Sequence, residues 1–141
     1  VAAGARASEW ISAGTERARL RYSFVMFEDF DFSPQFDVVV DPEFPGDGDW
    51  GAPTFAFGRD GELLAEPESR WGTPAVLDVE PSSSPRWVGT FAAGGLGGYR
   101  VACATPSPSH LCVVVDGLAY LVGVDRPEAG ALIAHDQVGQ V

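Results

Sequence analysis

The sequence predicts an all-β domain, mainly antiparallel, in which about seven to nine short strands form a sandwich or a partly open barrel. The chain contains 17 Gly and 11 Pro among 141 residues, and this content favours short strands and turns over long helices. An Asp-Gly pair separates two apolar stretches at Asp60-Gly61 and again at Asp116-Gly117, which predicts two hairpins. We expect a single domain over residues 1–141, with part of a larger sheet or propeller-like assembly as the alternative.

The sequence of the N-terminal third indicates few helices or strands. Residues 8–20 permit at most one short helix, whereas residues 20–27 place apolar side chains at every second position, as a strand does. After this strand the alternation of apolar and polar side chains changes phase, and a bulge or turn near Glu28 accounts for this change. Residues 36–40 predict a strand, and the Pro- and Gly-rich residues 41–49 predict a loop.

The first Asp-Gly pair predicts a hairpin over residues 54–66. A two-residue turn sets Arg59 opposite Glu62 and Phe57 opposite Leu64, which places an apolar pair behind a charge pair. Further along the chain we expect strands at 75–79 and 86–91, a loop at 81–85, and a flexible Gly-rich connection at 94–98.

The most regular pattern is a strand meander from Gly98 to Val124. Residues 99–104 alternate, whereas residues 111–115 are apolar throughout, which predicts a central strand covered on both faces. The turn at Asp116-Gly117 predicts four cross-strand pairs: Val115 with Leu118, Val114 with Ala119, Val113 with Tyr120, and Cys112 with Leu121.

The segment from Ala131 to Val141 predicts a last strand that stops without a turn signal, after a loop at residues 125–130. Such an end indicates either a piece of a longer polypeptide or a strand that pairs with another molecule. An exposed sheet edge near Ala131 to Val141 is therefore our candidate surface for another protein or for a second copy of the chain.

Charge and composition narrow the classes of function. A formal net charge of −11 disfavours nucleic acids and anionic membranes as partners. The sequence lacks both Lys and Asn, which indicates a high-GC bacterial genome. With no signal peptide or transmembrane stretch, we expect a cytoplasmic location and thiols at Cys103 and Cys112. Whether these two cysteines face each other depends on a strand register that the sequence leaves open.

Four acidic residues in the loop at 41–49 are the best metal candidates in the chain: Asp41, Glu43, Asp47 and Asp49. Several carboxylates on a flexible Pro- and Gly-rich backbone suit calcium, but their spacing differs from that of an EF-hand loop. A solvated acidic turn explains the same residues. We expect no cofactor, because the Gly-rich segment at 94–98 precedes a strand and not a helix N-terminus.

A hydrolase would have to use His110, which follows two serines in the loop before the central strand. Asp116 or the acidic loop would supply its carboxylate. No Gly-x-Ser-x-Gly elbow is present, and a polar turn residue is the simpler interpretation of His110. No catalytic residue is assigned on this basis.

The segment from Thr105 to Val122, together with Arg86 to Phe91, resembles an uncharacterised family of β-rich bacterial proteins. The resemblance covers the second half of the chain and rests on strand and turn residues. It implies that related chains continue beyond the point matching Val141 with further strands, and it implies no catalytic residue.

The absence of a coherent catalytic set favours a non-enzymatic protein-interaction module. A sharper form of this hypothesis is an acidic immunity or antitoxin-like protein that masks a basic partner in a salt-sensitive complex. The alternatives are a calcium-dependent binding module and a hydrolase using His110.

Overall fold

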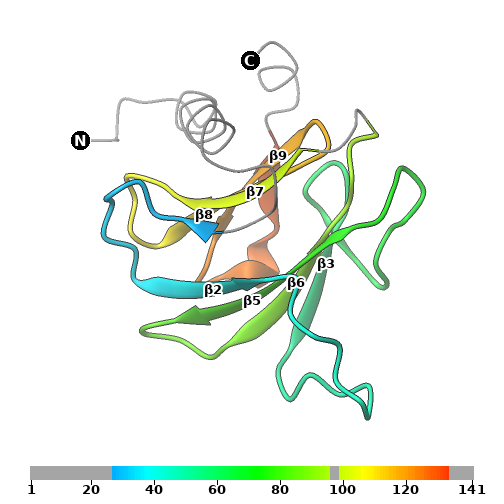
Figure 1. Cartoon of the computed structure of the whole chain (residues 1–141), viewed down its shortest axis with the longest axis horizontal. Helices are drawn as coiled ribbons and strands as arrows, with labels where there is room; N and C mark the ends of the chain where they lie inside the picture. The colour runs from blue at the N-terminus through cyan, green and yellow to red at the C-terminus, as the bar shows by residue number, and fades with distance from the viewer. Residues whose placement is uncertain (1–26, 96–98, 134–141) are drawn as a thin grey trace.

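The computed structural model describes residues 27–95 and 99–133, which form two five-stranded sheets packed as a sandwich (Figure 1). Sheet A has the order β1 (Phe27–Glu28), β7 (Arg100–Ala104), β8 (His110–Val115), β9 (Leu118–Gly123) and β10 (Ala131–Ile133). Sheet B has the order β2 (Phe36–Val40), β5 (Ala75–Pro81), β6 (Trp87–Phe91), β3 (Thr54–Phe57) and β4 (Leu63–Leu64). The predicted sandwich is confirmed, and the two sheets do not close into a barrel.

Both sheets are mixed, although antiparallel pairing dominates as predicted. Six of the eight strand pairings in the described residues are antiparallel, and two are parallel, β1 with β7 and β3 with β6. The helical content of these residues is a single 3-10 turn at Pro127–Ala129. No helix in the described part of the chain is long and apolar enough to cross a membrane.

The core lies between the sheets and centres on aromatic side chains. Phe57 stacks on Phe91 with ring centroids 4.7 Å apart, and Phe91 meets Tyr120 of the opposite sheet edge to face at 5.2 Å. Two buried hydrogen bonds join the layers. The indole N–H of Trp87 donates to the Val124 carbonyl at 2.8 Å. The hydroxyl of Tyr120 donates to the Ala92 carbonyl at 2.6 Å.

The meander of β7, β8 and β9 follows the predicted pattern. All four predicted pairs across Asp116-Gly117 are present, and both turn residues have positive φ angles, 48° and 97°, as a two-residue type I′ hairpin turn requires. Every residue of β8 after His110 is buried, which confirms a central strand covered on both faces. Cys103 and Cys112 are partners across the β7–β8 ladder and are free thiols.

The predicted register of the first hairpin is wrong by one residue. Phe57 pairs with Leu63, because the loop contains three residues, Arg59 to Gly61, and not two. The Gly58 N–H donates to the Glu62 carbonyl at 2.8 Å, and Gly61 adopts a positive φ of 82°. This is a three-residue hairpin loop ending in a left-handed glycine, to which an Asp-Gly pair is equally suited.

The remaining sequence predictions concern the turn near Glu28, the loop at 81–85 and the two ends of the chain. The turn near Glu28 is present, since the Phe32 N–H donates to the Asp29 carbonyl at 2.9 Å. Pro81, predicted as loop, is the last residue of β5, where a strand tolerates a missing N–H. The helix expected at 8–20, the strand at 20–27 before Phe27, and residues 134–141 of the last strand lie outside the described residues.

Candidate functional site

Strand β2 forms one edge of sheet B and exposes backbone groups there. The Asp41 N–H donates to the Val76 carbonyl, and the Gln35 carbonyl accepts the Ser82 N–H, each at 2.9 Å. Since backbone direction alternates along an antiparallel strand, the N–H and C=O groups of Val38 and Val40 point away from β5. No strand in the described part of the chain pairs with this side of β2.

The loop between β2 and β3 carries an aromatic pair at its surface. Phe44 is 68% exposed, and its ring meets that of Trp50 edge to face with centroids 5.5 Å apart. Val39 is 56% exposed on the outer face of sheet B. Apolar side chains left in solvent near an open strand edge are typical of a protein-binding surface.

Acidic residues are frequent in the part of the chain that contains this surface. Between Arg21 and Arg59 the sequence contains eight acidic residues and no basic one. Four of the eight are the calcium candidates of the loop, and Asp37 lies on β2 opposite Glu80. The β2 surface is our name for the β2 edge together with exposed or half-buried residues on or after this strand: Val39, Phe44, Trp50, Asp37, Asp41, Glu43, Asp47 and Asp49.

The four calcium candidates do not converge. Asp41, Glu43, Asp47 and Asp49 are all exposed, and no group of three or more His, Cys, Asp or Glu within the described residues is placed to hold a metal ion. The Asp47 carboxylate accepts the Asp49 N–H at 3.0 Å, and the Asp49 carboxylate accepts the Gly51 N–H at 2.8 Å. These short-range bonds shape the loop backbone.

The outer face of sheet B contains one strong ion pair beside the β2 surface. Arg86 makes two hydrogen bonds to the Asp78 carboxylate, at 2.8 and 3.0 Å, and Asp78 lies opposite Val39 in the β2–β5 ladder. The hydrogen bond to Asp78 raises the pKa of the Arg86 guanidinium, and the nearby Glu80 charge adds to the shift. This cation is thus already paired.

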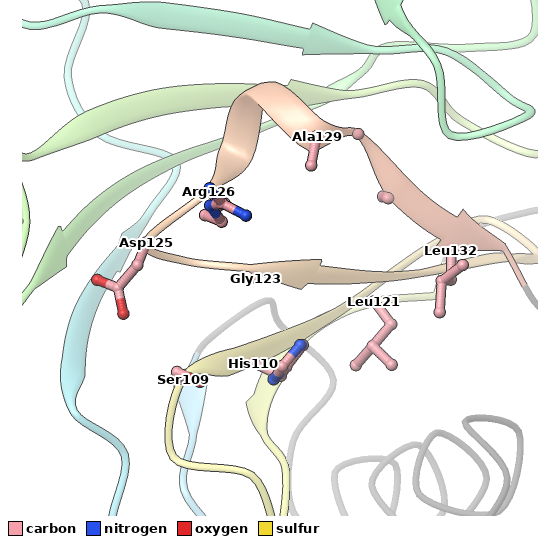
Figure 2. Close-up of a pocket in the computed structure, with 10 residues that line it drawn as sticks. Ser109, His110, Leu121, Gly123, Asp125, Arg126, Ala129 and Leu132 are labelled. Atoms are coloured by element: carbon pink, nitrogen blue, oxygen red, sulfur yellow. The ribbon is translucent and has the colours of Figure 1, made fainter.

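A pocket lies on the outer side of sheet A, near the start of β8 (Figure 2). Its cavity measures about 430 Å³, within the range of small-molecule sites. His110 and Gly123 are partners across β8 and β9, and Leu121 and Leu132 are partners across β9 and β10, so these four share one face. The connection between β9 and β10 completes the lining with Asp125, Arg126 and Ala129.

The structure does not assemble the hydrolase that the sequence allowed. The Ser107 hydroxyl lies 2.8 Å from His110 Nδ1, which is a serine–histidine contact. Asp116, however, lies beyond the far end of the six-residue β8, about 20 Å away, and its carboxylate binds Arg100 at 3.0 Å. The acidic loop belongs to the other sheet. The only side-chain hydrogen bond of His110 within the described residues is the one to Ser107, and the hydrolase hypothesis stays a prediction.

The predicted interaction edge at β10 is partly occupied. Leu132 is 66% exposed, but the Ala131 N–H that points away from β9 donates to the Gly61 carbonyl at 2.9 Å. The tip of the β3–β4 hairpin therefore covers the beginning of this edge. Residues 134–141, where the rest of the predicted edge would lie, are outside the described residues.

Comparisons with known proteins identify no relative of this chain. No protein-family model matches it. No curated protein and no solved structure is found to be similar. The resemblance of the second half to a β-rich bacterial family therefore stays a prediction, and function must be argued from the two sites above.

The sequence contains a signal for one of the two sites, the β2 surface, that the strand analysis did not use. A stretch of 37 residues without a basic side chain, residues 22–58, coincides with the β2 surface. Nothing comparable marks the pocket, because His110 and Arg126 come from different segments and only the register of β8, β9 and β10 brings them to one cavity.

Proposed function

We propose that the protein is a non-enzymatic binding module that captures an extended, basic segment of another protein at the β2 surface. One observation carries the proposal: the open edge of β2 lies within a part of the chain that has eight acidic and no basic residues. An added strand would pair with the free backbone groups of Val38 and Val40. Acidic neighbours favour basic side chains on that strand.

The exposed apolar groups suit the same ligand. A strand presents alternate side chains to opposite sides, so a segment that alternates basic and apolar residues can place the two kinds separately. Its apolar side chains can contact Val39 and Phe44, which are the most exposed apolar groups of the β2 surface. An immunity or antitoxin-like role, in which the module masks a basic partner, is the form of this function that the charge favours.

The edge of β2 is a better binding edge than that of β10. The outward N–H of Ala131 is already bonded to Gly61, whereas the described residues leave the outward groups of Val38 and Val40 without a strand partner. We therefore place the partner at β2.

A labelled hexapeptide of alternating Arg and Val tests the proposal by fluorescence anisotropy on the full chain. We expect saturable binding that weakens strongly between about 50 mM and about 500 mM salt, because exposed charges are screened over a shorter distance at high salt. A Glu/Val peptide of the same length should not bind. Equal affinity for the two peptides, or an affinity that does not change with salt concentration, would contradict the proposal.

Two variants locate the site. Val38→Pro removes one outward N–H at an edge position that tolerates proline, and should weaken binding about fivefold to tenfold. Phe44→Ser should also weaken binding, whereas Leu63→Ser, which changes an exposed side chain on β4, serves as the control. If Val38→Pro and Phe44→Ser keep full affinity while remaining folded, the peptide binds elsewhere.

A further inference from the structure

The pocket of Figure 2 has an apolar wall and a polar end. Leu121, Ala129 and Leu132 supply the apolar part, and Leu132 remains 66% exposed at its rim. Arg126 and His110 supply polar groups from two different segments. The lining therefore combines the Arg126 guanidinium and the His110 imidazole with the carboxylate of Asp125.

Arg126 is available to a ligand. Its side chain is exposed and makes no hydrogen bond or ion pair with any residue that the structure describes. The neighbouring carboxylate of Asp125 accepts a hydrogen bond from the Ser84 hydroxyl. Asp125 also lines the pocket, and Figure 2 shows it on the side remote from Leu121 and Leu132.

The second ring nitrogen of His110, Nε2, lies near Gly123 in the pocket lining. The Ser107 hydroxyl holds Nδ1 at 2.8 Å, and when that hydroxyl donates, the ring proton resides on Nε2. Gly123 stands opposite His110 in the ladder, and a Cβ added there would lie 3.8 Å from Nε2. The glycine thus keeps the space beside Nε2 free of a side chain, and an acceptor group can enter it.

We propose that this pocket binds a small amphipathic anion, namely a carboxylate with a hydrocarbon body. The carboxylate lies between the Arg126 guanidinium and the Nε2–H of His110, and charge-assisted hydrogen bonds of this kind are stronger than neutral ones. The hydrocarbon body packs on Leu121, Leu132 and Ala129, burying the exposed Leu132 side chain. The site is on sheet A and is independent of the β2 surface.

Three ligands that differ only in their head groups test the proposal: decanoate, 1-decanol and decyltrimethylammonium. Titration calorimetry on the full chain at neutral pH, below micelle-forming concentrations, should show saturable one-to-one binding of decanoate. Decanol should bind about tenfold more weakly, because it lacks the charge that Arg126 pairs with, and the cation more weakly still. Equal affinities for the three would mean purely hydrophobic adsorption and would overturn the proposal, as would no saturable binding of decanoate.

Variants separate the two parts of the pocket. Arg126→Gln should lower decanoate affinity about tenfold and abolish the preference over decanol, whereas Arg70→Gln, an exposed arginine outside the pocket, should change neither. Leu132→Asp should weaken all three ligands without unfolding the chain, since that side chain is mostly exposed. Full decanoate affinity in Arg126→Gln would refute the assignment. Phe44→Ser should leave decanoate binding intact. The test of the pocket is therefore independent of the test of the β2 surface.

Discussion

The hydroxyl of Tyr120 offers a stability measurement with two separate readouts. Tyr120 is fully buried, and its hydroxyl donates to the Ala92 carbonyl at 2.6 Å, across the interface between the sheets. Tyr120→Phe removes the donor and leaves a buried carbonyl without that partner. Loss of such a bond costs about 1–3 kcal/mol, and we expect the variant to be less stable by that amount at pH 7.

The second readout is the pH dependence of this difference. Burial raises the pKa of the Tyr120 hydroxyl well above its ordinary value near 10, and the charge of Glu68 adds to the shift, while Arg59 opposes it. Above about pH 10, the Tyr120 hydroxyl therefore stays protonated in the native state, whereas the same hydroxyl loses its proton in the unfolded chain. Because the native state then binds more protons, wild-type stability falls as pH rises above about 10.

The size of the change follows from the unfolded pKa. At pH 11 the unfolded tyrosine is deprotonated and the native one is not, which costs the wild type about 1.4 kcal/mol through this side chain. The phenylalanine variant has no such group, so its deficit relative to wild type should shrink by about 1.4 kcal/mol between pH 7 and pH 11.

Urea unfolding of both proteins at pH 7 and pH 11, followed by tryptophan fluorescence, measures the two quantities. Phe57→Leu is the control, because it disturbs the same aromatic cluster without a titrating group, and its deficit should be independent of pH. A Tyr120→Phe deficit that is absent at pH 7, or constant between the two pH values, would refute the reasoning.

Two further substitutions test a contact between the sheets at Gly61 and an ion pair within sheet A at Arg100. Gly61→Ala should destabilise the protein by about 2 kcal/mol, since Gly61 has a positive φ and an added Cβ would overlap the Ala131 carbonyl. The control Gly46→Ala has open space around the added Cβ and should be near neutral in thermal melts. Equal melting temperatures would contradict the proposed contact. Arg100→Met should cost about 3 kcal/mol in urea unfolding, because it leaves the buried Asp116 carboxylate without its ion pair; a loss below about 1 kcal/mol would show that solvent satisfies that carboxylate.

The two Asp-Gly pairs show how far local sequence determines this fold. At Asp116-Gly117 the dipeptide forms the predicted two-residue turn, and the register of β8 and β9 follows from it. At Asp60-Gly61 the same dipeptide ends a three-residue loop, and the Gly61 carbonyl accepts the Ala131 N–H from the other sheet. The local signal predicts a hairpin in both cases. In the second hairpin the loop is one residue longer than predicted, and it contacts a residue 70 positions away in the chain.

By itself, the sequence determined the all-β class, the buried central strand β8 and the acidic character of the molecule, because these depend on side-chain periodicity, turn chemistry and charge. The choice between a sandwich and a partly open barrel came from the tertiary structure. Tertiary structure alone decided the parallel pairings of β1 with β7 and β3 with β6, since such pairs join segments that no turn connects. It also decided both sites. The open side of β2 results from its place at the end of a sheet, and the pocket results from the register that brings His110 and Arg126 together.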